Sequence, residues 1–134
     1  MLRRMARALR ILIVEDDEPL RRMIRHAMAL SGYEVQEAGN GLHALHLIDT
    51  HPPDAVILDL ALPIVSGRAV LAEIAAHAHM REIPFIVITG TPGRHDGLGV
   101  VSVLRKPFEM DRLLTTVRGC IASGVPPRAT PEGC

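Results

Sequence analysis

The chain alternates short apolar runs with longer segments in which apolar residues recur every three or four positions. Five runs are typical of strands: residues 10–14, 33–38, 54–60, 84–90 and 100–106. Two of them, 54–60 and 84–90, are almost continuously apolar, as expected for strands buried on both faces of a parallel sheet. Four segments carry the helical period: 19–30, 40–50, 67–80 and 109–121. This alternation predicts an α/β protein with a parallel sheet, right-handed crossovers and helices on both faces.

Turn and cap residues support these boundaries. Pro19 suits the first turn of a helix, and Gly32 suits the position just past its end. Asn40 and the following glycine could form a hairpin, but the helical period after them favours Asn40 as a helix cap. The weak link is the segment 91–99, which holds three glycines and a proline. At most one short, irregular turn of helix is expected there.

Composition and charge exclude several classes of protein. The 134 residues allow one compact domain, and the 48% of hydrophobic residues suffice for a core, which must be aliphatic because only 2% are aromatic. The formal net charge is zero, so nothing indicates direct binding of nucleic acid or of an anionic membrane. No stretch approaches the roughly 20 apolar residues of a membrane span. The two cysteines, Cys120 and Cys134, frame no domain, which favours a reducing, cytoplasmic location.

The folded domain is expected to occupy residues 10–122. Residues 1–9 form a basic N-terminal extension, and no apolar segment long enough for a signal peptide follows it. Residues 123–134 are rich in proline and glycine and are expected to be a flexible tail.

Polar residues stand where four of the five predicted strands end. Glu15 and Asp16 end the first strand, Asp59 the third, Thr89 the fourth and Lys106 the fifth. The carboxyl ends of parallel strands lie along one edge of the sheet, where ligands bind near the reversal of strand order. Each residue alone has an ordinary explanation as a turn, strand or surface residue. Their shared place at one edge makes a common site the better interpretation.

Three carboxylates at one edge repel one another unless a cation joins them. Oxygen ligands without histidine or cysteine favour Mg²⁺, which takes one or two carboxylates and leaves positions for phosphate oxygens. The site is therefore expected to receive a phosphoryl group, with Asp59 as the nucleophile that forms an acyl phosphate. The next two acids, Asp17 and Glu18, open the following helix, where negative charge suits the N-terminal end of the dipole.

Together these motifs resemble the receiver domain of two-component response regulators. The similarity rests on ILIVEDDE at residues 11–18, VILDLALP at 56–63 followed by Gly67, PFIVITG at 84–90, and RKPF at 105–108. It covers about residues 10–121, and the spacings from Asp16 to Asp59 and from Asp59 to Thr89 are usual for the family. The resemblance implies a doubly wound, five-stranded parallel sheet in the flavodoxin-like order 2-1-3-4-5.

The resemblance also implies a role for each matched acidic position. Glu15 and Asp16 would be the acidic pair that holds Mg²⁺, with Asp16 as the direct ligand. Asp59 would be the phosphoacceptor and a further ligand of the metal. Ala61 would lend its backbone carbonyl to the same ion.

The remaining matches concern the response to phosphorylation. Thr89 corresponds to the switch hydroxyl of the family, and Lys106 to the lysine that pairs with the phosphoryl group. The peptide bond between Lys106 and Pro107 is expected to be cis, as is common in the family. Val103 departs from the pattern, because many receivers carry an aromatic residue there that changes rotamer as the hydroxyl moves.

A second departure lies between Thr89 and Lys106, where the spacing is shorter than is common in the family. The missing residues would belong to the fourth helix of the family pattern, which is therefore expected to be short or replaced by a loop. This favours a subgroup of stand-alone receivers in which that helix is mobile or missing. We expect residues 91–99 to be a flexible loop that phosphorylation or a partner orders.

The sequence thus predicts a stand-alone, single-domain receiver that catalyses only its own phosphorylation and dephosphorylation. The donor would be a sensor histidine kinase or a phosphotransfer protein, and phosphorylation would change the affinity for a downstream protein target. One alternative is a degenerate receiver that acts as a constitutive interaction module without phosphorylation. Another is a small phosphohydrolase, which would need a second acid where this chain has Ala61. The identity of the partners, the direction of regulation and the formation of a homodimer are left open.

Overall fold

The structure is a computed structural model, and it describes residues 8–77, 82–90 and 102–123. Within them the elements follow the order β1 (Arg10–Val14), α2 (Glu18–Leu30), β2 (Glu34–Ala38), α3 (Gly41–Thr50), β3 (Ala55–Asp59), α4 (Gly67–Ala75), β4 (Phe85–Thr89), β5 (Ser102–Arg105) and α5 (Met110–Ser123). This alternation confirms the α/β class that the apolar pattern predicts.

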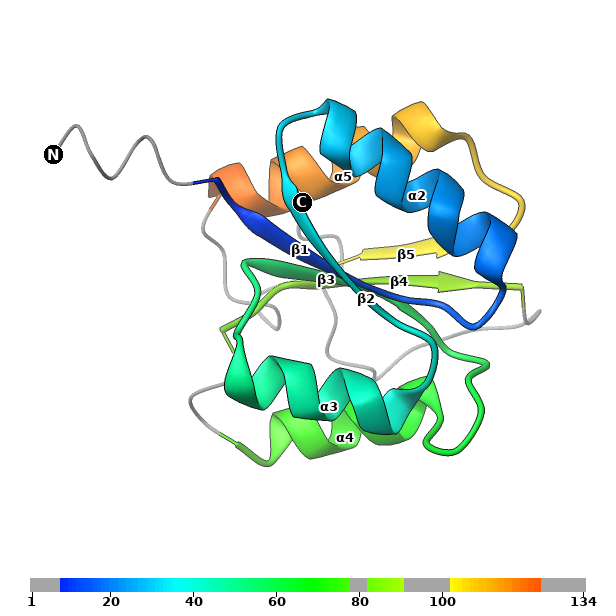
Figure 1. The fold of residues 1–134 in the computed structure, drawn as a ribbon, viewed down its shortest axis with the longest axis vertical. Coiled ribbons are helices and arrows are strands. Elements are labelled where there is room, and N and C mark those ends of the chain that lie inside the picture. Colours follow the sequence, from blue (N-terminus) through cyan, green and yellow to red (C-terminus); the bar gives the residue numbers. More distant parts are fainter. Residues whose placement is uncertain (1–7, 78–81, 91–101, 124–134) are drawn as a thin grey trace, which may run out of the picture.

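One five-stranded sheet forms the centre of the molecule. Its strand order is β2-β1-β3-β4-β5, and all neighbouring strands are parallel, which confirms the doubly wound order 2-1-3-4-5. Figure 1 shows α2 and α5 on one face of the sheet and α3 and α4 on the other. The strand order reverses between β1 and β3, so the carboxyl ends of these two strands border the crevice in which such folds bind ligands.

Both faces of the sheet bury aliphatic side chains. On β1, Ile11 and Ile13 pack toward α2 and α5, whereas Leu12 and Val14 pack toward α3 and α4. β3 and β4 are buried along their whole length, which accounts for their continuous apolar runs. Cys120, on α5, is buried in the core, with 1% of its surface exposed.

The helices begin and end where capping residues stand. Asp17 is the N-cap of α2, and its side chain accepts a hydrogen bond from the N–H of Leu20 at 3.2 Å. Asn40 is the N-cap of α3 and accepts from the N–H of His43 at 2.8 Å, which confirms the prediction of a cap instead of a hairpin. Gly32 follows α2 with a φ of 94°, a conformation that favours glycine.

The helix predicted over residues 67–80 is shorter in the structure, where α4 ends at Ala75. The N–H of Ala76 closes its last turn, with bonds to the carbonyls of Ala72 at 3.3 Å and Glu73 at 3.1 Å. Ile74 is the last buried residue of the helix. Ala76 and His77, which directly follow, offer no large apolar side chain to pack on the core, and packing supplies most of a helix's stability.

Several expectations fall on residues outside the described ranges. These are most of the N-terminal extension 1–9, the loop at 91–99 with the expected loss of the family's fourth helix, and the C-terminal tail beyond residue 123. The domain bounds of 10–122 therefore stay predictions. None of the helices in the described part of the chain combines the length and the apolar character needed to cross a bilayer.

Candidate functional site

The sheet brings four strand ends to one edge. Glu15 directly follows the last residue pair of β1 with β3, and Asp59 ends β3 next to it. Thr89 ends β4, and Lys106 follows β5, where its backbone N–H donates to the carbonyl of Thr89 at 2.8 Å. The structure therefore places these residues on the same edge, as the strand-end pattern predicts.

Lys106 bridges the two buried carboxylates of the site. Its Nζ lies 2.8 Å from Oε1 of Glu15 and 3.1 Å from Oδ2 of Asp59. The second oxygen of each acid accepts a backbone bond: Asp59 Oδ1 from the N–H of Ala61 at 3.2 Å, and Glu15 Oε2 from the N–H of Asp17 at 3.0 Å. The side chains of Glu15 and Asp59 are 1% and 4% exposed, whereas that of Lys106 is 25% exposed. The lysine thus reaches in from the rim and offsets the repulsion between the two acids.

One ammonium does not balance this pair. Burial raises the pKa of Glu15 to about 7, the hydrogen bonds from Lys106 and the Asp17 N–H act against that rise, and the nearby Asp59 adds to it. Burial acts to lower the pKa of Lys106, but its bonds to Glu15 and Asp59 outweigh that effect, so the pKa rises. An acid with a raised pKa beside a lysine with a raised pKa indicates an excess of negative charge, which a further cation would relieve.

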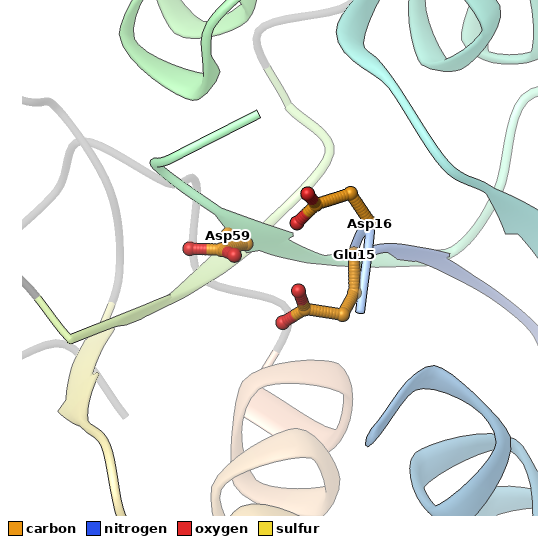
Figure 2. A group of neighbouring side chains, drawn as sticks. All are labelled: Glu15, Asp16 and Asp59. Carbon is orange, nitrogen blue, oxygen red and sulfur yellow. The ribbon is translucent and has the colours of Figure 1, made fainter. Parts of the chain in front are cut away.

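Asp16 adds a third carboxylate to the group. One oxygen from each of Glu15, Asp16 and Asp59 lies within 4.8 Å of the others. Figure 2 shows Glu15 and Asp16 at the end of β1 and Asp59 at the end of β3, with the carboxylates close together. Asp16 is exposed, and within the described ranges no hydrogen bond or ion pair joins its side chain to another residue. Its oxygens are therefore the ones in this group that are open to a ligand.

The other predicted site residues occupy nearby positions. Thr89 is buried, with 1% of its surface exposed, and Ala61 is exposed two residues beyond the phosphoacceptor candidate. The peptide bond between Lys106 and Pro107 is cis, as the resemblance implies. Val103 lies on β5 and is 37% exposed, so the position at which many receivers carry an aromatic residue is on the surface in this protein.

The loop from β3 to α4 is held tightly beside Asp59. A Cβ atom at Gly67 would lie 2.5 Å from the carbonyl oxygen of Asp59, so only glycine allows α4 to begin so close to this backbone. Ile64 has a φ of 69° and is 75% exposed, and the N–H of Val65 donates to the carbonyl of Pro63 at 2.8 Å around it. A β-branched residue in the left-handed region is strained, and the sequence pattern gives no sign of this turn.

Arg21, in the first turns of α2, also contacts the site, although neither the apolar pattern nor the strand-end residues point to it. Its Nη1 donates to the backbone carbonyl of Glu15 at 2.8 Å, and its Nε donates to Oε1 of Glu37 at 3.0 Å. Arg25 pairs with the other oxygen of Glu37 at 3.1 Å. The available signal was positional: an arginine one turn after the N-cap Asp17 can reach back to the end of β1.

The donor set suits a hard divalent cation. All three candidate ligands are carboxylates, and no histidine or cysteine of the described residues belongs to the group. Mg²⁺ prefers such oxygen ligands and binds through one or two carboxylates while keeping several waters. The exposed Asp16 offers a carboxylate without a partner among the described residues, beside the buried Asp59.

Comparison with known proteins identifies relatives of the chain. A family model described as the response regulator receiver domain matches residues 11–118. The response regulator MprA of Mycobacterium sp. (strain KMS) is 34% identical over 117 residues, which make up 84% of this chain and 50% of MprA. The chain therefore spans about half the length of this relative.

Solved structures share the fold over most of the chain. The signal receiver domain of a putative Luxo repressor protein from Vibrio parahaemolyticus matches with a TM-score of 0.81 at 28% identity, covering 88% of this chain and 93% of that domain. The receiver domain of the sensor histidine kinase PA1611 from Pseudomonas aeruginosa PAO1 matches with a TM-score of 0.80 at 26% identity, covering 87% of this chain and 99% of that domain. In that structure a magnesium ion is coordinated in the active site cleft.

Proposed function

Because this chain belongs to the family of response regulator receiver domains, we propose that it is a phosphorylation-dependent switch of two-component signalling with Asp59 as the phosphoacceptor. The observation that carries the proposal is the meeting of Asp59 and Lys106 with two further carboxylates at the edge where the strand order reverses. A structural salt bridge alone would not need a third, exposed acid beside the two that Lys106 bridges.

The proposed reaction is transfer of a phosphoryl group to an oxygen of Asp59. The donor is a phosphohistidine of a histidine kinase or a phosphotransfer protein. A bond forms between the carboxylate oxygen and phosphorus while the bond from phosphorus to the imidazole nitrogen breaks, and the electron pair of the broken bond stays on that nitrogen. The other ring nitrogen of the phosphohistidine carries a proton, so the group that leaves is neutral imidazole. Lys106, already at 3.1 Å from Asp59, pairs with an oxygen of the transferred group, and the hydroxyl of Thr89 binds a second one.

Mg²⁺, when bound, offsets the negative charge of the carboxylates and of the incoming phosphoryl oxygens. In the proposal Asp16, Asp59 and the backbone carbonyl of Ala61 hold the ion, and Glu15 completes the acidic set. Within the pair of Glu15 and Asp16, Glu15 is buried with a hydrogen bond on each oxygen, whereas Asp16 is exposed and has no side-chain partner among the described residues, which favours Asp16 as the direct ligand. The magnesium ion in the cleft of the PA1611 receiver domain supports this assignment.

The proposed partners follow from this chemistry. A phosphohistidine donor on one side and a downstream protein target on the other make the domain a relay between two proteins. The identification of the relatives as response regulators supports the donor class. The cytoplasmic location and the stand-alone organisation stay predictions, and the formation of a homodimer stays open.

The experiment is incubation with Mg²⁺ and a small phosphodonor such as acetyl phosphate, followed by measurement of the intact mass. We expect a gain of one phosphoryl group in the wild type and none in Asp59→Asn. Asp49→Asn, a change at an exposed acid on α3, is the matched control and should be phosphorylated like the wild type.

Two other outcomes would replace the proposal. No gain of mass with any donor would support the degenerate receiver that acts as a constitutive interaction module. Rapid turnover of added phosphoesters would support the phosphohydrolase, although the position where that enzyme would need its second acid is Ala61.

A further inference from the structure

We propose that Arg21 is a positioning residue of the metal site. By holding the peptide group that precedes Asp16, Arg21 sets the direction of the Asp16 carboxylate. The inference rests on the proposed function, in which Asp16 binds Mg²⁺. Arg21 is distinct from the acids, the threonine and the lysine of the proposed phosphorylation site.

The argument begins with the isolation of Asp16. Glu15 and Asp59 are buried and each oxygen of theirs accepts a hydrogen bond, so their side chains have fixed positions. Asp16 is exposed and, within the described ranges, has no side-chain partner. The backbone on either side of Asp16 therefore sets the direction in which its side chain leaves the chain, and with it the positions that its carboxylate can reach.

That backbone is anchored on both sides. The peptide before Asp16 contains the carbonyl of Glu15, which accepts the bond from Nη1 of Arg21 at 2.8 Å. The peptide after Asp16 contains the N–H of Asp17, which donates to Oε2 of Glu15 at 3.0 Å. The N–H of Glu15 is bonded to the carbonyl of Ala38 at 3.1 Å, which ties the same turn to the end of β2. Arg21 thus supplies the anchor on one of the two peptides that orient the ligand.

Arg21 is itself well placed for this task. Its side chain is only 20% exposed, and its Nε is bonded to Glu37 at 3.0 Å while Nη1 reaches Glu15. The planar guanidinium holds Nε and Nη1 in a fixed relative geometry. The ion pair between Nε and Glu37 on β2 therefore directs Nη1 toward the Glu15 carbonyl at the end of β1. A lysine, with a single ammonium on a flexible stem, could not hold both partners in the same way.

The neighbouring arginines of α2 provide matched controls. Arg25 pairs with the other oxygen of Glu37 at 3.1 Å but makes no bond to the turn at Glu15. Arg22 is 64% exposed and pairs with Glu18 within the helix. Arg21→Gln and Arg25→Gln both remove one positive charge and one partner of Glu37, and only Arg21→Gln removes the bond to the Glu15 carbonyl.

The experiment is calorimetric titration of Mg²⁺ alone into the unphosphorylated chain of 134 residues, as wild type, Arg21→Gln, Arg25→Gln and Arg21→Lys. Urea unfolding of each variant first establishes that it is folded at the temperature of the titration. We expect Arg21→Gln to weaken the affinity for Mg²⁺ about tenfold, as is common when a residue that orients a metal ligand is lost. Arg25→Gln should stay within about twofold of the wild type, because screening weakens the effect of one exposed charge.

General electrostatics acts in the opposite direction, since removing a positive charge near the acids favours a cation. A weaker affinity in Arg21→Gln therefore reports geometry and not charge. Arg21→Lys keeps the charge and loses the paired donors of the guanidinium, so it should also bind Mg²⁺ more weakly than the wild type. It replaces Arg21→Gln in the test if the glutamine variant does not fold. Equal affinity in the Arg21 and Arg25 variants would overturn the inference and leave the proposed function standing. Failure of the wild type to bind Mg²⁺ would overturn both.

Discussion

Two charged clusters lie next to each other at the ends of neighbouring strands, and they have opposite charge balances. The acidic site contains three carboxylates and one cation: Glu15, Asp16, Asp59 and Lys106. The arginine brace contains one carboxylate and two cations: Glu37, Arg21 and Arg25. The distances between charged atoms are alike in the two clusters, so geometry alone does not distinguish a binding site from a structural contact.

Burial and charge balance do distinguish them. The carboxylates that Lys106 bridges are nearly inaccessible, so an unbalanced charge there is costly and a further cation is favoured. In the brace Glu37 is 36% exposed and Arg25 47%, so water screens the excess positive charge. An unbalanced cluster of charges is therefore informative about function when it is buried, and much less so when it is exposed and screened by water.

The strongest test of this difference is Lys106→Met, which removes the single cation from the acidic site. We expect the rate of phosphorylation of Asp59 to fall at least about 100-fold, as for the loss of one donor that stabilises transition-state charge. The affinity for Mg²⁺ should rise, because a competing positive charge has been removed from beside the carboxylates. Phosphorylation rates and Mg²⁺ titrations measure the two effects.

Arg105→Met is the control for Lys106, because it removes a positive charge from an exposed position one residue earlier. Its rate of phosphorylation should stay close to that of the wild type. A parallel loss of rate and of Mg²⁺ affinity in Lys106→Met would mean that the site has collapsed instead of losing one electrostatic contact.

A smaller effect is expected from the pH dependence of stability in the absence of metal. The pKa of Glu15 is raised to about 7 by burial, so between pH 4.5 and 7 the folded state holds a proton that the unfolded state has released. The free energy of unfolding should therefore decrease as the pH rises through this range, by roughly 1–3 kcal/mol. Glu15→Gln should lose this part of the dependence, and urea unfolding of both proteins at several pH values measures it. An identical pH dependence in the two proteins would show that Glu15 is not the group concerned.

The smallest effect is expected from Glu37→Gln in the arginine brace. The amide oxygen can still accept one hydrogen bond from Arg21, and the lost ion pairs are partly exposed, so the free energy of unfolding should decrease by only about 1 kcal/mol. Phosphorylation should remain within about twofold of the wild-type rate, because the amide oxygen keeps the hydrogen bond that holds Arg21 in place and no member of the acidic site changes. Urea unfolding and intact-mass kinetics provide the two measurements, and a large loss of rate would erase the distinction between the two clusters.

The local elements follow from the sequence because their signals are local. Continuous apolar runs are sufficient for strands buried on both faces, and Asn40 at the start of a helical period is sufficient for a cap. The expectation over residues 67–80 failed at its end, because α4 ends at Ala75, directly after its last buried residue Ile74, and Ala76 and His77 bring no large apolar side chain that would continue the packed face. Helix propensity depends on a residue and its neighbours in the sequence, whereas packing depends on which residues face the helix in the folded protein.

The sequence by itself determined which residues stand at the strand ends, because a parallel sheet places those ends along one edge whatever fills the core. Only the tertiary structure decided how the acids differ: Glu15 buried against a lysine from the other end of the chain, and Asp16 exposed between two anchored peptides. The same holds for Arg21, whose partners lie on two different strands. Burial and long-range hydrogen bonds depend on pairs of residues that are distant in sequence, and a one-dimensional pattern does not specify such pairs.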